Sequence, residues 1–312
     1  MNLAVIAGPG NPALAEAIAA RLGIRPCGVT LERFPDTELH AEIKASVRGQ
    51  DVYLVQPTGP PVDAHLMELL FLSDACRRAG AARITAIVPY FGYARQDRRA
   101  KGREAVGGRL AAELVRTVGL DRIVAVDLHT VSLEGFFGIP LEHLTAMPLL
   151  RIAVGESNPA NAVVVSPDLG AVKLAERFAE PLGLPLAIVH KIRLSGQQVK
   201  VRGIVGDVNG RAPIIIDDMI STAGTIEAAA KALIEAGCTP EITVAAAHAL
   251  FVGPAIERLS ALPLKQIVVT DSLPAPLHGA LPLRVVSLAP MLAEAIAHLN
   301  RDESIEELAT RR

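Results

Sequence analysis

Short apolar runs alternate with amphipathic helical stretches along nearly the whole chain, and this alternation restricts the fold more than any other feature. Runs of Val, Ile, Leu and Ala predict strands at residues 3–6, 52–55, 83–88, 122–126, 162–165, 186–189, 213–216, 242–246 and 266–269. Helical periodicity predicts helices at residues 12–22, 63–79, 105–118, 170–180, 225–236 and 289–300. Such alternation is typical of strands joined by right-handed helical crossovers, so the predicted fold is α/β, with mainly parallel sheets flanked by helices.

The chain length of 312 residues allows two domains or one large α/β unit. The alternation runs through both halves, and a segment with Asn and Pro at residues 156–159 interrupts it. We therefore expect two similar lobes, at residues 1–147 and 148–287. The apolar stretch within residues 288–312 predicts a last helix that packs back onto the first lobe.

Composition excludes several classes of protein. The net charge of −2 leaves no basic surface of the kind that nucleic-acid-binding proteins use. The three cysteines, Cys27, Cys76 and Cys238, show neither a disulfide framework nor metal-site spacing, which indicates a reduced, cytoplasmic protein. The N-terminus lacks the pattern of a signal peptide, and no uncharged apolar run is long enough to span a bilayer. We expect no nucleic-acid or membrane partner.

The segment from Ile214 to Thr225 carries the strongest functional signal. A buried strand is followed by two acidic residues and a small, hydroxyl-rich loop that leads into a helix. Free N–H groups at a helix N-terminus bind anions, and adjacent carboxylates suit hydroxyls or Mg²⁺. The predicted sugar-phosphate ligands are Asp217 and Asp218 for the hydroxyls or metal, and Ser221, Thr222, Gly224 and Thr225 for the phosphate. The alternative is an ordinary strand–turn–helix, but vicinal carboxylates without a local cation favour function.

Further polar groups follow other predicted strands. The loop after residue 88 concentrates cations, which suits a polyphosphate, although a solvated basic loop is about as common. His129 follows a strand, and a lone histidine is more often structural. Asp168 suits Mg²⁺ bound to phosphate oxygens. Lys191 and Arg193 are two positions apart, so an extended chain sends both charges to the same side, over a transferring phosphoryl group.

Five motifs occur in the order and spacing of ribose-phosphate pyrophosphokinases: Tyr93–Arg98, Asp127–His129, Ser166–Asp168, Lys191-x-Arg193 and Asp217–Thr225. The chain resembles this family from about Phe34 to about Ile305. The resemblance implies two phosphoribosyltransferase-like domains, with residues 1–147 and the helix at 288–312 on the ATP side and residues 148–287 on the ribose 5-phosphate side. It also implies transfer of the β,γ-diphosphoryl group of Mg-ATP to O1 of ribose 5-phosphate, which yields AMP and phosphoribosyl diphosphate.

The resemblance also assigns roles to residues. Ribose 5-phosphate is expected on Asp217, Asp218, Ser221, Thr222, Ala223, Gly224 and Thr225. ATP is expected on Arg95, Gln96, Asp97 and His129, and its adenine on Phe34, Asp36 and Glu38 of a neighbouring subunit. Mg²⁺ is expected on His129 and Asp168, with Lys191 and Arg193 as the catalytic cations. Recognition across subunits implies a homo-oligomer, a hexamer or a dimer.

The sequence also departs from the family pattern. Thr37 takes a glycine position in the adenine loop, and the C-terminal segment lacks the usual phenylalanine that would help to seat an inhibitory ADP. The other departures near the predicted site are Ala171, Leu174, His190, Ile192 and Ser221. Two alternative functions remain, a non-catalytic paralogue of the enzyme and a phosphoribosyltransferase that consumes the activated sugar.

Overall fold

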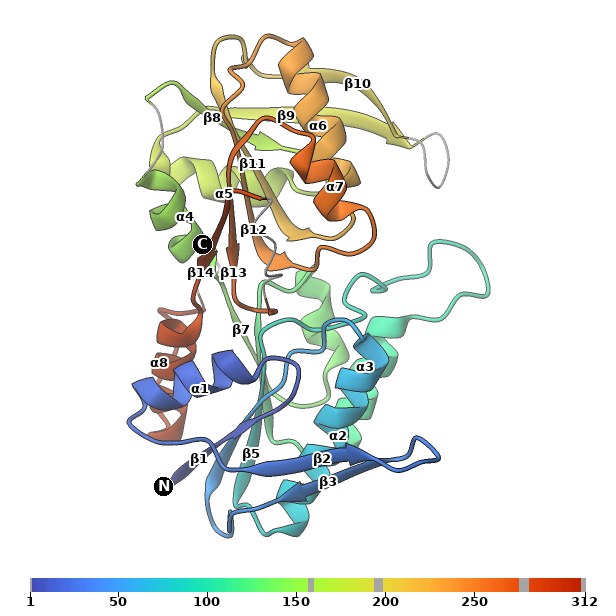
Figure 1. Cartoon of the computed structure of the whole chain (residues 1–312), viewed down its shortest axis with the longest axis vertical. Helices are drawn as coiled ribbons and strands as arrows, with labels where there is room; N and C mark the ends of the chain where they lie inside the picture. Colours follow the sequence, from blue (N-terminus) through green and yellow to red (C-terminus); the bar gives the residue numbers. More distant parts are fainter. Residues whose placement is uncertain (1, 157–159, 194–198, 275–280, 310–312) are drawn as a thin grey trace. The chain divides into compact units, whose positions relative to one another are not determined.

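A computed structural model describes residues 2–156, 160–193, 199–274 and 281–309, with the backbone alone for 191–193 and 199–201. The chain divides into two compact units (Figure 1). The first unit comprises the chain up to Thr145, the segment Ser272–Pro274 and the C-terminal part from Ser287. The second unit comprises Ala146–Asp271 and the segment that ends at Val286. The first unit therefore contains sequence from both ends of the protein.

The first unit is built on a parallel sheet whose described strands run in the order β1-β4-β5-β6-β7. These strands are β1 (Leu3–Ala7), β4 (Asp51–Val55), β5 (Arg83–Val88), β6 (Arg122–Val126) and β7 (Leu141–Leu144). An antiparallel hairpin, β2 and β3, is inserted before β4. The remaining elements are β2 (Val29–Arg33), β3 (Leu39–Ile43), α1 (Pro12–Arg21), α2 (Val62–Arg78), α3 (Gly107–Thr117), the 3₁₀ helix η1 (Val131–Phe136) and α8 (Ala289–Asn300).

Helices cover both faces of the first sheet. Helices α1 and α8 pack together on one face, and α2 and α3 lie on the other (Figure 1). Because neighbouring side chains of a strand point to opposite faces, alternate residues such as Val52 and Leu54 join Leu69 and Leu72 of α2 in one core. The β2–β3 hairpin packs against α2.

A buried carboxylate ties the C-terminal helix to the first sheet. Asp51 on β4 is fully buried and accepts hydrogen bonds from Arg83 on β5 at 2.5 and 3.0 Å and from Tyr53 at 2.8 Å. Asn300 at the end of α8 donates to the same carboxylate at 2.9 Å. Arg83 also donates to the carbonyl oxygen of Leu299 at 3.0 Å. One charge pair therefore joins two adjacent strands to the end of α8.

The second unit is built on a sheet whose described strands run in the order β10-β9-β8-β11-β12-β13-β14. The edge strand β10 is antiparallel to β9, and the other pairs are parallel. The strands are β8 (Ala162–Ser166), β9 (Leu186–Arg193), β10 (Val199–Val205), β11 (Ala212–Ile220), β12 (Ile242–Ala249), β13 (Leu264–Thr270) and β14 (Leu283–Val286). The helices are α4 (Met147–Gly155), α5 (Val172–Ala179), the 3₁₀ helix η2 (Glu180–Leu182), α6 (Gly224–Glu235) and α7 (Ala255–Ser260).

The central strands of the second sheet are buried on both faces. Val164 and Ile214 pack in one core with residues of α4 and α5, whereas Val163 and Ile215 pack in another with residues of α6 and α7. Figure 1 shows these two pairs of helices on opposite sides of the sheet. Burial on both faces explains why these strands appear in the sequence as continuous apolar runs.

The predicted α/β fold class is confirmed, and every predicted strand and helix overlaps an observed element of the same type. Residues 157–159 of the predicted break lie outside the described part of the chain. The sequence analysis missed some elements, namely β2, β3, β7, β10, β14, α4 and α7. It was also wrong about Asp217 and Asp218, which lie within β11 and not after its end, because β11 stays paired with β12 as far as Ile220. No helix in the described residues is long and apolar enough to cross a membrane.

We predict that Arg83→Met destabilises the first unit by about 3–5 kcal/mol, because it leaves the buried carboxylate of Asp51 without its charged partner. Denaturant unfolding would measure this loss. The matched control is Arg78→Met, which breaks an exposed ion pair with Asp74 and is expected to cost about 0–1 kcal/mol. Equal losses in the two variants would contradict the proposed role of Arg83.

The carboxylate of Asp51 also makes the stability of the fold depend on pH. Burial acts to raise the pKa of Asp51, but hydrogen bonds from Arg83, Asn300 and Tyr53 outweigh it and hold the pKa below its usual value. A carboxyl group with a lowered pKa stabilises the fold above its unfolded pKa of about 3.9, and this contribution is lost as pH falls through the folded pKa. The stability difference between parent and Arg83→Met should therefore shrink in acid.

Candidate functional site

The candidate site in the second unit lies where the order of the strands reverses. The chain passes from β8 through α5 to β9 on one side, and from β11 through α6 to β12 on the other. Open α/β sheets bind ligands outside the carboxyl ends of the strands at such a point. Pairing between β8 and β11 ends at Val165 and Ile215, although β11 continues to Ile220. Within the described part of the chain, the last residues of β11 therefore have no strand partner on the β8 side.

Acidic side chains gather at this end of the sheet. Asp168 lies in the turn after β8, where its side chain accepts hydrogen bonds from the N–H groups of Gly170 at 2.9 Å and Ala171 at 3.3 Å. The side chain of Asp217 accepts a hydrogen bond from the N–H of Asp218 at 2.9 Å. Burial raises the pKa of Asp217 well above its usual value, and the nearby carboxylates of Asp218 and Asp168 raise it further. The charges of Asp218 and Asp168 thus both act on the carboxyl group of Asp217.

A bound divalent cation would relieve this repulsion. Among the described residues, no group of three His, Cys, Asp or Glu side chains is arranged to hold a metal by itself. Mg²⁺ does not need such a group, because it keeps several waters and binds one or two carboxylates together with phosphate oxygens. Oxygen donors next to the loop at residues 221–225, which the sequence predicts to bind phosphate, would therefore fit magnesium that arrives with a phosphorylated substrate.

The loop after β11 has the conformation of an anion-binding turn. Ala223 adopts the left-handed region with φ of 58°, and α6 begins at the next residue, Gly224. The N–H groups of Phe251 and Val252, which follow β12, bond to the carbonyl oxygens of Ile220 and Ser221 and anchor the start of the loop. The positive end of the α6 dipole faces the loop, as a bound phosphate requires. The residues expected to bind ribose 5-phosphate lie at the end of β11, in this loop and at the start of α6: Asp217, Asp218, Ser221, Thr222, Ala223, Gly224 and Thr225.

In the first unit, three of the predicted ATP ligands, Arg95, Gln96 and Asp97, lie in the loop between β5 and α3. Tyr93 adopts a positive φ of 61°, and its hydroxyl donates to Asp63 on α2. Gln96 is exposed, and its backbone bonds to Tyr93 at 2.8 Å and to Gly108 at 3.1 Å. A Cβ at Gly107 would lie 2.5 Å from the Gln96 side-chain oxygen, so glycine there leaves room for this side chain over the start of α3. Arg95 is also exposed.

The turn after β6 carries His129 and is held by side chains from other segments. Asp127 adopts a positive φ of 41°, and its carboxylate accepts a hydrogen bond from Thr145 at 2.7 Å. His143 on β7 accepts the Leu128 N–H through Nε2 at 2.9 Å. The other ring nitrogen of His143 contacts Glu134 of η1 at 2.9 Å, which sets the tautomer with a proton on Nδ1.

His129 itself is exposed beyond this turn. The next residue, Thr130, donates to Asp97 at 3.2 Å, so the turn after β6 meets the loop after β5. Two of the segments expected to bind ATP are therefore in contact. The sequence analysis did not single out His143, because its role depends on the pairing of β7 with β6.

The three residues expected to bind adenine lie at the tip of the β2–β3 hairpin. Phe34, Asp36 and Glu38 are all exposed, and Phe34 also contacts the His40 ring. Backbone bonds from Phe34 to Glu38 and from Thr37 to Phe34 close the tip. Thr37 has φ of 76°, a backbone conformation that glycine adopts more readily than other residues.

The predicted catalytic cations lie on β9. The backbone of Lys191 pairs with that of Val201 on β10, and the backbone of Arg193 pairs with that of Val199. The side chains of both residues lie outside the described part of the structure. Their catalytic role stays a prediction, as does the effect of Ile192 between them.

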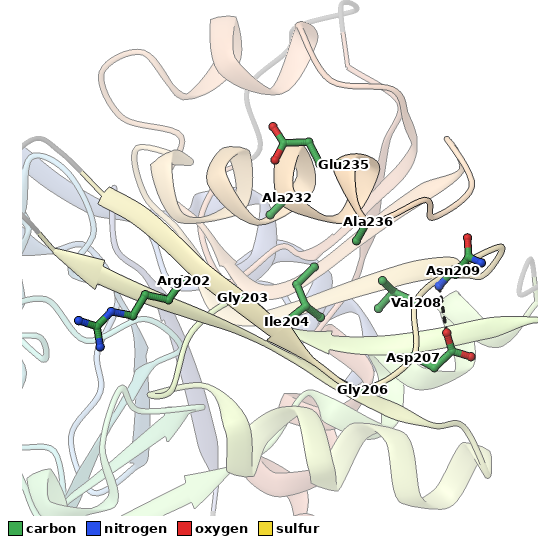
Figure 2. Close-up of a pocket in the computed structure, with 10 residues that line it drawn as sticks. All are labelled: Arg202, Gly203, Ile204, Gly206, Asp207, Val208, Asn209, Ala232, Glu235 and Ala236. Carbon is green, nitrogen blue, oxygen red and sulfur yellow. Dashed lines mark hydrogen bonds between the residues drawn. The ribbon is translucent and has the colours of Figure 1, made fainter.

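A cavity of about 520 Å³ lies between β10 and the C-terminal half of α6 (Figure 2). Ile204 and Val208 line one wall, and Ala232, Glu235 and Ala236 line the other. The loop at residues 221–225, which we call the phosphate-type loop, is at the N-terminal end of α6. A helix rises 1.5 Å per residue, so the loop is about 16 Å from Glu235 along the axis. The cavity is therefore separate from the candidate site.

Comparison with known proteins gives the family. A model described as the N-terminal domain of ribose phosphate pyrophosphokinase matches residues 3–119, and one described as a phosphoribosyl synthetase-associated domain matches residues 197–310. The chain is 44% identical over 309 residues to a ribose-phosphate pyrophosphokinase of Gloeobacter violaceus, covering 98% of this chain and 93% of the relative. The chain belongs to the ribose-phosphate pyrophosphokinase family. The family resemblance drawn from the motifs is confirmed.

Other relatives support membership of the same family. A ribose-phosphate pyrophosphokinase of Rhodopirellula baltica is 45% identical over 311 residues, which cover 98% of each chain. The crystal structure of phosphoribosylpyrophosphate synthetase from Mycobacterium smegmatis superimposes with a TM-score of 0.88 at 39% identity, covering 97% of this chain and all of that one. This member of the ribose-phosphate pyrophosphokinase family is an enzyme, as the sequence analysis predicted.

We predict that Asp217→Asn makes the metal-free enzyme more stable at pH 8. A carboxyl group whose pKa is raised by folding stabilises the fold below its unfolded pKa, and this contribution is lost as pH rises through the folded pKa. The amide carries no charge at any pH and keeps an oxygen acceptor for the Asp218 N–H. A gain of about 1 kcal/mol would raise the melting temperature by roughly 2–4 °C.

Calorimetry in EDTA at pH 4 and pH 8 measures the effect, which should nearly vanish at pH 4 because Asp217 is then protonated. Asp207→Asn is the control, since Asp207 is an exposed acid in the same unit. A variant no more stable than the parent at pH 8 would refute the proposed repulsion.

Proposed function

We propose that the protein is a ribose-phosphate diphosphokinase that transfers the β,γ-diphosphoryl group of Mg-ATP to O1 of ribose 5-phosphate. The products are phosphoribosyl diphosphate and AMP. The observation that carries the proposal is the phosphate-type loop beside Asp168, Asp217 and Asp218 at the strand-order reversal of the second sheet. Family membership over 98% of the chain supports the same reaction.

We assign the second unit to ribose 5-phosphate. The 5-phosphate binds to the N–H groups of the loop from Ser221 to Thr225, where the α6 dipole favours negative charge. The carboxylates of Asp217 and Asp218 accept hydrogen bonds from the ribose hydroxyls. This arrangement fixes the sugar by both ends and sets the direction in which O1 points.

We assign the first unit to ATP. Arg95, Gln96 and Asp97 in the loop after β5, together with His129, bind the nucleotide. The hairpin tip with Phe34, Asp36 and Glu38 is exposed, which suits insertion into the site of a neighbouring subunit. The protein would therefore work as a homo-oligomer. Oligomeric state and cytoplasmic location stay predictions from the sequence.

Positioning and charge neutralisation dominate diphosphoryl transfer, since the transition state needs little covalent help from the protein. The residues that the sequence predicts as metal ligands are Asp168 and His129, and Mg²⁺ bound by them would supply positive charge that neutralises phosphate oxygens. Asp168 is itself oriented by the N–H groups of Gly170 and Ala171. We assign to Lys191 and Arg193 the stabilisation of the charge that develops on the transferring group.

The direct test is AMP release from ATP and ribose 5-phosphate, measured with and without Mg²⁺. We expect AMP and phosphoribosyl diphosphate in equal amounts, and neither product when Mg²⁺ or the sugar phosphate is left out. A non-catalytic paralogue would release no AMP. A phosphoribosyltransferase would instead consume phosphoribosyl diphosphate when a nucleobase is supplied. Either outcome would refute the proposal.

We predict that Lys191→Ala lowers turnover by about 10³–10⁵-fold, the contribution of a cation in the arginine-finger role. Its affinity for ribose 5-phosphate should change little, because Lys191 acts on the transition state. Steady-state kinetics with a binding titration would separate the two effects. The control is Lys265→Ala, which removes a cation that pairs with Glu241 on the surface of the same unit. Near-full turnover in Lys191→Ala would exclude Lys191 from the mechanism.

A further inference from the structure

We propose that Arg258 is a positioning residue for the 5-phosphate loop, acting through the loop backbone and not on the substrate directly. This inference rests on the proposed function, because it concerns the loop assigned there to ribose 5-phosphate. Arg258 lies on α7, 36 residues after Thr222. Nothing in the motif pattern of the sequence points to it.

The guanidinium group of Arg258 bridges the loop and the first turn of α6. Its Nη1 donates to the carbonyl oxygen of Thr222 at 3.0 Å. Its Nε lies 3.1 Å from the carboxylate of Glu227. Glu227 also pairs with Lys231 at 2.6 Å. One side chain thus holds both the loop and the helix that follows it.

Fixing the Thr222 carbonyl also fixes an N–H group. The peptide between Thr222 and Ala223 is planar and trans, so its C=O and N–H point in opposite directions. Arg258 holds the oxygen on one side and thereby aims the Ala223 N–H to the other. Within the described part of the chain, no hydrogen bond uses the N–H of Thr222 or Ala223 as donor. These two groups remain available to an anion.

The loop needs such support because its conformation is strained. Ala223 has φ of 58°, and the left-handed region costs an alanine about 1–2 kcal/mol. Packing against Arg258 is close as well, since a Cβ at Gly224 would lie 3.0 Å from Nη1. Glycine at this position therefore lets the guanidinium approach the loop. The hydrogen bond to Thr222 and this close packing favour one loop geometry.

Arg258 shares its ion-pair partner, Glu227, with Lys231. Glu227 lies in the first turn of α6, where its negative charge would repel an incoming phosphate. Arg258 and Lys231 both pair with Glu227 and offset this charge. Only Arg258 also touches the loop. Comparison of the two cations therefore separates loop orientation from simple charge compensation.

The test compares Arg258→Met with Lys231→Met, measuring the affinity for ribose 5-phosphate by calorimetry and the kinetic constants by AMP release. We expect Arg258→Met to weaken ribose 5-phosphate binding and raise its KM by roughly tenfold or more, the scale of one charge-assisted hydrogen bond. The KM for ATP should stay within about twofold of the parent value. Lys231→Met should change neither substrate constant by more than about twofold.

A conservative variant keeps the test decisive if Arg258→Met does not fold. Arg258→Lys keeps the charge and one donor for the Thr222 carbonyl but cannot bridge to Glu227 as well, so it should recover part of the lost affinity. Thermal unfolding of each variant is measured alongside. If Arg258→Met does not fold, a loss of ribose 5-phosphate affinity in Arg258→Lys that Lys231→Met does not share supports the inference.

Two results would overturn the inference. One is unchanged ribose 5-phosphate affinity in folded Arg258→Met, or in Arg258→Lys when the methionine variant does not fold. The other is an equal loss in Lys231→Met, which would reduce the effect to net charge. The proposed function is judged separately by AMP release from the parent enzyme. A parent that binds ribose 5-phosphate but forms no AMP would refute that function, while the calorimetric comparison would still decide the role of Arg258.

Discussion

The unequal length of β8 and β11 is the constraint on which the second unit depends. Because β11 extends beyond the end of its neighbour β8, its last residues are unpaired on that side among the described residues. Asp217 and Asp218 lie there, near Asp168. Folding brings these like charges together and raises the pKa of Asp217, so their mutual repulsion works against stability. A bound cation would relieve that repulsion.

Four of the loops that the sequence analysis assigned to a substrate contain a residue with strained backbone. Thr37, Tyr93, Asp127 and Ala223 all have positive φ although none is glycine. Such conformations cost of order 1–3 kcal/mol and persist only where neighbours hold them. The neighbours come from distant elements: α2 for Tyr93, the residue after β7 for Asp127 and α7 for the loop at Ala223. Local geometry at the site is therefore maintained by tertiary structure.

Sequence reasoning found the fold class and the substrate loops, because both leave local patterns. It missed the β2–β3 hairpin even though Val29–Arg33 and Leu39–Ile43 alternate apolar and polar residues, since these partly buried strands lack the continuous apolar runs of the central strands. It ended β11 too early because aspartate is uncommon in strands, and pairing with β12 overrides that preference. Arg258 could not be found this way, because only folding brings it to Thr222.

The attachment of α8 to Asp51 and Arg83 has a consequence for synthesis. The strands of the first sheet are complete once Leu144 has been made, yet Asn300 comes some 156 residues later. At translation rates of about 5–20 residues per second, this delay is roughly 8–30 s. During that interval the nascent first lobe has one sheet face without α8, while the second lobe is still leaving the ribosome. The amino-terminal half is therefore translated first but completed last.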